Sequence, residues 1–240
     1  MEFVTCDPLP ALELVPISDV HVGARSAAVD QFQAFLADLP HHPHRRIVLL
    51  GDLGNYALKD SRSNPYEDVL HPQDELDLLL RWLRPVKDRI LGVVPGNHEE
   101  RIWRSAGIDI SRILAEAFGV PYGEATLVLR IPVGSVTYTV CCHHGTGGGR
   151  TTARFEGNHR LAQIVDADVY ISGHIHSLHV AREAHYHTDG ELRLHEQVFV
   201  TTAGWAQYEV YAERMALKPG VVRITQLHFH PAERFIEVRC

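Results

Sequence analysis

Short runs of hydrophobic residues alternate with amphipathic stretches along the first two thirds of the chain. The runs are LELVPIS, RRIVLL, RILGVV and DVYIS, at residues 12–18, 45–50, 89–94 and 168–172. Each run is short and almost entirely apolar, which is typical of a buried strand. Between them, hydrophobic residues recur three and four positions apart. This spacing predicts helices over residues 26–39, 76–83 and 110–117, and a further helix is expected near residues 160–165.

The later part of the chain is richer in predicted strands. ATLVLRI (125–131) and SVTYTVCC (135–142) surround Pro132-Val133-Gly134, a sequence that favours a hairpin turn. Three more strands are expected, at residues 181–187, 192–202 and 221–229. The simplest architecture is an α/β (α+β) fold in which two packed sheets form a sandwich with helices outside. Residues 1–240 are expected to form one domain, because no Pro/Gly/Ser-rich linker or repeat interrupts the pattern.

Composition and charge narrow the classes of function. The chain carries a formal net charge of −7, which is the wrong sign for a protein that coats long nucleic acid. We expect no membrane association, because no apolar run is long enough to cross a bilayer, and we expect no secretory signal. Four cysteines do not suggest a disulfide framework, so a cytoplasmic location is expected. The 17 histidines are an excess that suggests metal ligands.

Polar residues cluster where the predicted strands end. The clusters are Asp19-Val20-His21, Gly51-Asp52, Gly96-Asn97-His98-Glu99, His143-His144-Gly145 and Gly173-His174-Ile175-His176. Any one of them could be a helix cap or a turn. In open α/β sheets, however, ligands bind beyond the carboxyl ends of the strands, so five such clusters could converge on one site. Asp, His and Asn are also the residue types that build mixed nitrogen and oxygen metal sites.

This series of motifs resembles the calcineurin-like metallophosphoesterases in order and spacing, from about Asp19 to His176. The resemblance implies a two-sheet β sandwich flanked by helices, with a dinuclear metal centre at the strand ends. One departure is visible: the second motif reads Gly51-Asp52-Leu53-Gly54-Asn55, where the family often has a further acidic residue. That outer position usually supports the site and is not a direct ligand.

The resemblance also implies a role for each matching residue. The first metal would be held by Asp19, His21 and His176, the second by Asn97, His144 and His174, and Asp52 would bridge the two. His98 would face the substrate phosphate as the catalytic residue, with Glu99 as its orienting partner. Asn97 is also expected near the substrate, since its neutral amide limits the negative charge that would repel a phosphate.

The implied cofactors are two divalent metal ions, with manganese favoured and iron, zinc or nickel as alternatives. Two such cations, ~3.5–4 Å apart, can share a bridging hydroxide that attacks a phosphoester, while His98 assists at the phosphate or the leaving group. A shared carboxylate at Asp52 would keep the two cations together.

The stretch CCHHGTGGGR, from Cys141 to Arg150, raises three interpretations: a zinc site, a phosphate-binding loop or one corner of a larger site. Four adjacent residues cannot readily wrap one tetrahedral ion, and the glycines lack the Lys-Ser/Thr pair of a P-loop. The third interpretation is favoured, because His144-Gly145 matches a ligand motif of the family. The glycine-rich stretch after it resembles a phage and bacterial subgroup of that family. Alternation along a strand would point His143 away from His144.

Several substrate contacts are candidates without a motif to fix them. Arg150 and Arg154 are expected at the rim of the site, where they could reach a substrate phosphate, although a flexible loop with solvated arginines is an equal alternative. Arg101 and Arg104 are weaker candidates of the same kind. Trp205 or Tyr208 could line the substrate pocket, with packing in the sheet as the alternative.

The favoured function is a dinuclear metal-dependent phosphoesterase acting on a small phosphoester, with diesters preferred to monoesters. A nuclease acting on short or single-stranded ends is an alternative, with short nucleic acid as its partner. The chain carries His98 where lipid-precursor pyrophosphohydrolases of the superfamily typically carry arginine, which counts against that substrate. A catalytically silent metal-binding interaction scaffold and a mononuclear zinc hydrolase are further alternatives, and the sequence leaves the oligomeric state open.

Overall fold

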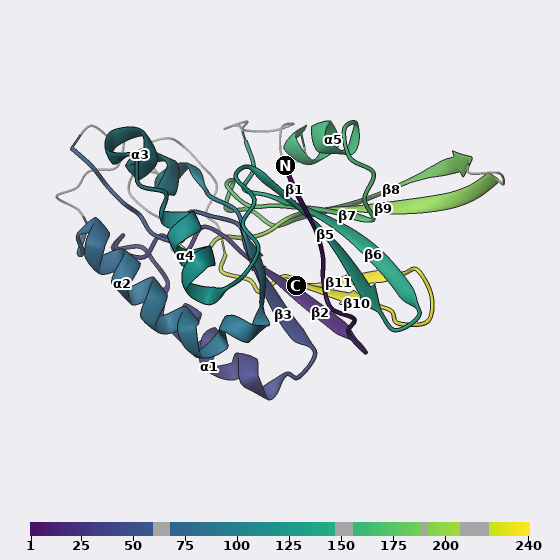
Figure 1. The fold of residues 1–240 in the computed structure, drawn as a ribbon, viewed down its shortest axis with the longest axis horizontal. Helices are drawn as coiled ribbons and strands as arrows, with labels where there is room; N and C mark the ends of the chain where they lie inside the picture. Colours follow the sequence, from purple (N-terminus) through teal and green to yellow (C-terminus); the bar gives the residue numbers. More distant parts are fainter. Residues whose placement is uncertain (60–67, 147–155, 189–191, 207–220) are drawn as a thin grey trace.

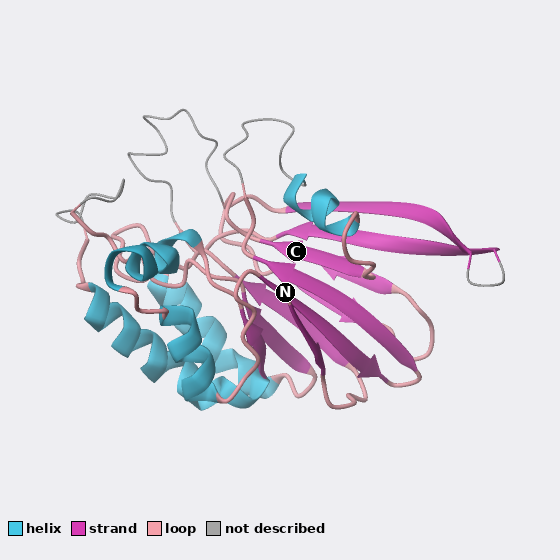
Figure 2. Cartoon of the chain, turned by 45° about the horizontal axis from the view of Figure 1, so that its top comes forward, coloured by secondary structure: helices cyan, strands magenta, loops and turns pink. Residues whose placement is uncertain are grey.

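The computed structural model describes residues 1–59, 68–146, 156–188, 192–206 and 221–240. Its strands form two sheets (Figures 1 and 2). The first has the order β1 (Glu2–Thr5), β5 (Thr126–Val133), β6 (Val136–His143), β7 (Val169–Ser172), β9 (Leu192–Thr201) and β8 (His179–Thr188). The second has the order β11 (Ile236–Arg239), β10 (Gln226–Phe229), β2 (Leu12–Ile17), β3 (Arg45–Leu49) and β4 (Ile90–Val93).

The helices cover the outer faces of this sandwich. They are α1 (Val29–Asp38), α2 (Pro72–Leu83), α3 (Asn97–Ala106), α4 (Ile110–Phe118) and α5 (Glu156–Ala162), with 3₁₀ turns at Leu39–His41 and Arg84–Arg89. Figure 1 shows α1–α4 gathered on one side and α5 apart from them. No helix in the described residues is long and apolar enough to cross a bilayer.

Three hydrophobic layers hold the elements together, and alternation along the strands assigns side chains to them. In β2, Val15 and Ile17 pack in the layer that contains α1, α2 and α4, while Leu14 packs between the two sheets. In β6, Cys142 lies between the sheets and Cys141 faces the layer under α5. Successive strand residues point to opposite faces, so strands covered on both sides are apolar throughout.

The parallel pairings bring the strand ends to common edges. β2 pairs with β3 and β3 with β4 in parallel, and in the other sheet β6 pairs with β7 in parallel. Parallel neighbours end at the same edge of a sheet, so the loops that follow β2, β3 and β4 lie together. The same holds for the loops after β6 and β7. This topology is what gathers the polar clusters.

The expected two-sheet sandwich flanked by helices is confirmed, with local differences. The predicted strand at 221–229 is wrong in its first half, because β10 begins at Gln226. The helix expected over 26–39 begins at Val29, since Ala27 is bridged to Ala206 before the helix starts. The helix expected near 160–165 lies earlier, at Glu156–Ala162. β1, β11 and α3 were not predicted.

Candidate metal centre

The five polar clusters meet at the strand ends. Asp19 and His21 follow β2, Asp52 follows β3, and Asn97 opens α3 after β4. His144 follows β6, and His174 and His176 follow β7. Buried among them are Asp19, His21, Asp52 and His144. Polar side chains are rarely buried without a purpose, because their desolvation must be offset by hydrogen bonds or by a bound ion.

The backbone at this edge is strained. Six described non-glycine residues have a positive φ, and five of them are candidate ligands: Asp19 (56°), His21 (51°), Asp52 (51°), His174 (70°) and His176 (50°). The sixth is Tyr56. Left-handed backbone costs a non-glycine residue roughly 1–3 kcal/mol, and such residues concentrate at functional sites. The left-handed conformations therefore lower local stability and orient these side chains toward one another.

Close backbone approach explains two motif glycines. A Cβ on Gly96 would lie 2.2 Å from Asp52 Oδ1 and 2.3 Å from Asp52 N. A Cβ on Gly173 would lie 1.9 Å from Ser18 Oγ. Neither distance leaves room for a side chain, so glycine lets the loops of different strands touch.

Three side chains form what we call the Asp19 cluster: Asp19, His21 and His176. His176 Nε2 lies 3.3 Å from Asp19 Oδ1 and 3.2 Å from His21 Nε2. His21 Nε2 lies 3.9 Å from the same carboxylate oxygen. Asp19 Oδ2 accepts a hydrogen bond from the His174 amide at 2.8 Å, which ties the loop after β7 to the loop after β2.

A second group, the His144 cluster, consists of Asn97, His144 and His174. His144 Nε2 lies 3.1 Å from Asn97 Oδ1 and 3.2 Å from His174 Nδ1. The other ring nitrogen, His144 Nδ1, donates to Leu50 O at 2.7 Å, which leaves Nε2 unprotonated in the neutral ring. A backbone carbonyl in this role is the usual device that orients a metal-binding histidine.

Asp52 stands between the two clusters. Its Oδ2 lies 3.2 Å from His144 Nε2, and Asp52 forms a possible ligand group with His144 and His174. It forms a second such group with His21 and His98. Its Oδ1 accepts from the His98 amide at 2.8 Å. One carboxylate is therefore within reach of ligands from both clusters.

The donor chemistry fits two cations. Two pairs of imidazole nitrogens face each other at 3.2 Å, an arrangement that a cation between lone pairs would stabilise. Within the described residues, buried Asp19 Oδ1 and His21 Nδ1 have no hydrogen-bond partner. Imidazole, carboxylate and amide oxygen are ligands for manganese, iron, zinc and similar ions.

The charges at the centre favour added positive charge. Burial would raise the pKa of Asp52, but the neighbouring His144 holds it well below its usual range. Burial would lower the pKa of His144, but the carboxylates of Asp52 and Asp19 raise it to about 10. In each case the attraction between carboxylate and imidazolium outweighs desolvation, so positive charge beside Asp52 is favoured.

His98 is oriented from two sides. Its Nδ1 donates to the main-chain oxygen of Asn55 at 2.7 Å, and its Nε2 lies 2.8 Å from Arg101 Nη2. Burial lowers the pKa of His98; Asp52 opposes this shift and Arg101 reinforces it. Asn55 stands where the family often has an acidic residue, and its own side chain donates to Asp68 Oδ1 at 2.7 Å. A carbonyl and not a carboxylate thus supports the imidazole.

The resemblance implied that Glu99 orients His98. In the structure, the hydrogen bonds of Glu99 run to main-chain amides. Its buried carboxylate accepts from three backbone amides: Asp52 N and Leu53 N at 2.8 Å and Gly96 N at 2.9 Å. Burial, followed by the charge of Asp52, raises the pKa of Glu99 to about 7. Glu99 therefore holds together the two loops that carry Asp52 and Asn97.

The remaining residues that the sequence suggested as substrate contacts have different outcomes. Arg150, Arg154 and Tyr208 lie outside the described residues. Trp205 is buried and its ring contacts Phe32 and Phe35, so it belongs to the core and the pocket hypothesis is wrong for this residue.

His143 and Arg104 are both engaged away from the ligands. The His143 ring turns to Asn158 Oδ1 at 2.7 Å, and Arg104 pairs with Glu100.

Arg101 is the contact that sequence reasoning undervalued. Its spacing from His98 is i, i+3, which places two side chains on one face of a helix. That signal could be used only if a helix was recognised at Asn97–Ala106, and no helix was predicted there.

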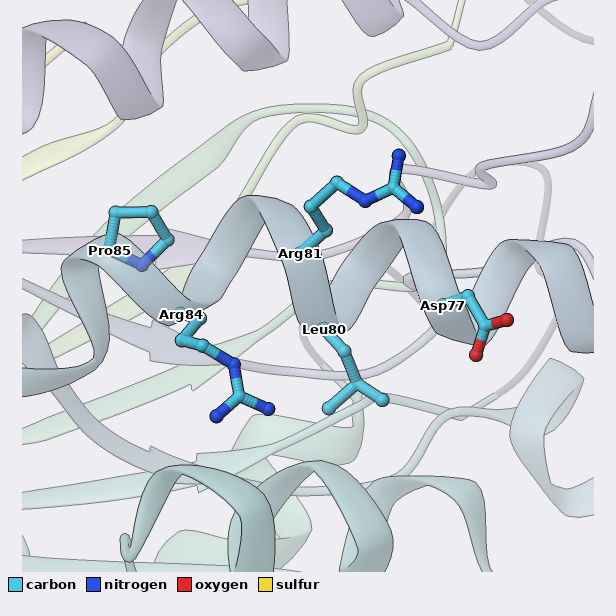
Figure 3. A pocket seen from close by; sticks show the side chains of 5 residues that line it. All are labelled: Asp77, Leu80, Arg81, Arg84 and Pro85. Carbon is cyan, nitrogen blue, oxygen red and sulfur yellow. The ribbon is translucent and has the colours of Figure 1, made fainter.

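A hollow of about 500 Å³ lies elsewhere, along α2 (Figure 3). It is lined by Asp77, Leu80, Arg81, Arg84 and Pro85. None of these residues belongs to either cluster, so the hollow is not part of the candidate metal centre.

Comparison with known proteins agrees with the motifs. Residues 14–178 match the family model described as calcineurin-like phosphoesterase. No curated protein matches the chain. Because the family match covers more than half of the sequence, the chain belongs to the calcineurin-like phosphoesterase family.

Solved structures match the chain at low identity. A conserved uncharacterized protein of Streptococcus pneumoniae, a predicted phosphoesterase, is 16% identical over 95% of this chain and 88% of that chain, with a TM-score of 0.43. Vps29 of Entamoeba histolytica, in complex with zinc, is 18% identical over 95% and 97%, with a TM-score of 0.44. A metallophosphoesterase of Sphaerobacter thermophilus is 16% identical over 95% and 87%, with a TM-score of 0.44.

Proposed function

We propose that this calcineurin-like phosphoesterase is a dinuclear metal-dependent hydrolase of phosphoesters. Asp19, His21 and His176 hold one cation, Asn97, His144 and His174 hold the other, and Asp52 is shared. The observation that carries the proposal is the position of Asp52, whose carboxylate is grouped with His144 and His174 on one side and with His21 and His98 on the other. A site for one cation would not need a carboxylate between two sets of ligands.

Two bound cations would supply an activated water at neutral pH and would neutralise charge on the phosphoryl oxygens. The protein contributes position and charge around them. His144 is held by Leu50 O and Asp52 by Glu99, so neither group needs to reorganise when substrate arrives. His98 presents Nε2 at 3.8 Å from Asp52 Oδ2, on the side where a phosphoryl group would lie. Protonation of Nε2, which would release the Arg101 N–H, allows His98 to donate to the phosphate or the leaving oxygen.

The guanidinium beside His98 distinguishes this residue from the proposed metal ligands. His98 appears in one possible ligand group, with His21 and Asp52. Its Nε2 already receives an N–H from a guanidinium, and a cation beside Arg101 would be repelled. We therefore assign His98 to the substrate and not to a metal.

Phosphodiesters are the proposed preferred substrates and phosphomonoesters the second class. The net charge of −7 supports a small substrate over duplex nucleic acid, and a nuclease acting on short or single-stranded ends is the alternative. An interaction scaffold is disfavoured, since it would need none of the buried, strained ligands. Manganese is the proposed metal because the donor set combines imidazole with carboxylate and amide oxygen.

The test is to strip the protein of metal, restore Mn²⁺ and compare hydrolysis of bis-p-nitrophenyl phosphate with that of p-nitrophenyl phosphate. We expect metal-dependent turnover of both, faster with the diester, and a fall of roughly a hundredfold in His98→Ala with unchanged metal content. A folded, Mn²⁺-loaded protein that hydrolyses neither substrate would refute the proposal.

A further inference from the structure

We infer that Arg101 contacts the substrate and determines selectivity, by binding the phosphoryl oxygen that a monoester has and a diester lacks. The inference rests on the proposed function. It concerns a residue of α3 that lies outside both clusters and carries a full positive charge at the substrate side of the centre.

Two contacts with described residues help to place the guanidinium. Arg101 Nη2 lies 2.8 Å from His98 Nε2, and Nη1 donates to Asn55 O at 3.3 Å. His98 Nδ1 donates to the same carbonyl oxygen at 2.7 Å. The imidazole and the guanidinium are therefore locked side by side through Asn55. A substrate oxygen bound by His98 Nε2 would take the place of the Arg101 N–H and lie beside Arg101 Nη2.

The chemistry of the phosphoryl group explains how Arg101 could distinguish monoesters from diesters. Two cations would take two of the non-leaving oxygens, in either substrate class. The third is an ester oxygen in a diester, with no charge, but an anionic oxygen in a monoester. A guanidinium forms short, charge-assisted hydrogen bonds with such an oxygen. Arg101 thus favours monoesters and limits the preference for diesters expected from the sequence.

The neighbouring arginine shows that the arrangement is not a general property of α3. Arg104 is exposed and pairs with Glu100 one turn away, at 2.7 Å. Arg101 is partly buried, and burial lowers its pKa while Asp52 and Glu99 counteract the shift. A cation kept at a cost of desolvation beside the centre is a candidate binding group, whereas Arg104 is an ordinary surface ion pair.

The experiment compares Arg101→Gln and Arg101→Lys with Arg104→Gln as the matched control, all Mn²⁺-loaded and checked for equal metal content and melting temperature. Steady-state kcat/KM is measured for p-nitrophenyl phosphate and bis-p-nitrophenyl phosphate. Binding of inorganic phosphate is measured by calorimetry, as a readout independent of turnover.

We expect Arg101→Gln to lose about tenfold or more in kcat/KM for the monoester and less than about threefold for the diester, with phosphate binding weakened about fivefold or more. Lysine should restore part of both losses, and Arg104→Gln should match the native protein. Equal losses on both substrates with unchanged phosphate affinity would overturn the inference, because Arg101 would then act only by positioning His98.

Failure of the proposed function and failure of the Arg101 contact give different results. If the native protein hydrolyses neither substrate with Mn²⁺, the proposed function is wrong. The phosphate titration then still decides about Arg101: unchanged affinity in Arg101→Gln refutes the contact, and weakened affinity supports it.

Discussion

The two clusters at the strand ends achieve similar ligand sets by different means. In the His144 cluster, only His174 has a left-handed backbone, and the central imidazole is oriented by Leu50 O. In the Asp19 cluster all three residues are left-handed, and the His176 side chain is 40% exposed. One cluster is oriented by hydrogen bonds and the other by backbone strain.

The difference has a consequence for metal binding. Ligands held by hydrogen bonds before the metal arrives lose little conformational entropy on binding. Asp19 Oδ1 lies 3.3 Å from His176 Nε2 but accepts no hydrogen bond from the described residues, and His21 Nδ1 has no hydrogen-bond partner among them, so the Asp19 cluster is less fully supported. The His144 cluster should therefore bind its cation more tightly, and the two cations should load in sequence.

The largest effect is expected at Asp52, the carboxylate that lies within reach of both clusters. Asp52→Ala should lower kcat/KM by about a thousandfold or more and weaken both cations, because Asp52 is within reach of ligands from each side. Turnover and metal content are measured together. Asp77→Asn, at an exposed site on α2, is the control. A variant that still binds two cations tightly would contradict a shared carboxylate.

Variants that disrupt one cluster at a time test which cluster binds its cation more tightly. His144→Ala and His176→Ala should each remove one cation and lower turnover by roughly a hundredfold or more. The cation that remains in His176→Ala should be the tighter one, since the His144 cluster is intact. Calorimetric titration of Mn²⁺ into each metal-free variant gives the two dissociation constants. The opposite order would show that strain, and not hydrogen bonding, makes the better site.

A smaller effect is expected at the support of the shared residue. Glu99→Gln keeps the shape but weakens three bonds to backbone amides, two of them from Asp52 and Leu53. Loss of such support typically costs about 10- to 100-fold in metal affinity. Glu100→Gln, its exposed neighbour, should leave affinity unchanged. If both variants bind metal equally well, Glu99 does not position Asp52.

The smallest effect concerns stability rather than metal. Glu75 on α2 is fully buried, and burial raises its pKa to about 8 despite a hydrogen bond from Tyr56 N. Its folded-state pKa lies above the unfolded value of about 4.5, so its stabilising contribution is complete below that value. This contribution falls as pH rises towards about 8, because only the unfolded state ionises freely.

Glu75→Gln should therefore show a smaller decline in melting temperature between pH 5 and pH 9 than the native protein, both measured without metal. Parallel melting curves over that range would mean that Glu75 does not remain protonated in the folded chain. Metal content at pH 7 should be unchanged in this variant, which separates a stability effect from a ligand effect.

The strand and helix pattern could be predicted in most of the core because burial on both faces leaves a continuous apolar run, as in β2 and β3. β1 and β11 were missed because they are edge strands whose side chains are mostly exposed or half-buried, so neither leaves a continuous apolar run. α3 was missed because its first turn is the motif Asn97-His98-Glu99, whose polar residues hide the helical period.

The candidate ligand residues could be named from the motif, but their geometry could not be predicted from the sequence. The motif order says nothing about which carboxylate lies between the clusters, because that depends on two sheets packing face to face. The role of Glu99 toward backbone amides is equally hidden, since main-chain partners leave no trace in residue identity. Arg101 was visible only as one of several arginines until α3 placed it beside His98.

The most direct test of a dinuclear centre is the magnetic coupling between bound manganese ions. Metal-free protein is titrated with Mn²⁺, and both the metal per chain and the electron paramagnetic resonance spectrum are recorded. The account predicts two Mn²⁺ per chain, with the signal of isolated Mn²⁺ replaced by that of an exchange-coupled pair as the second ion binds. One ion per chain, or two ions whose six-line signals simply add, would contradict a centre built around Asp52.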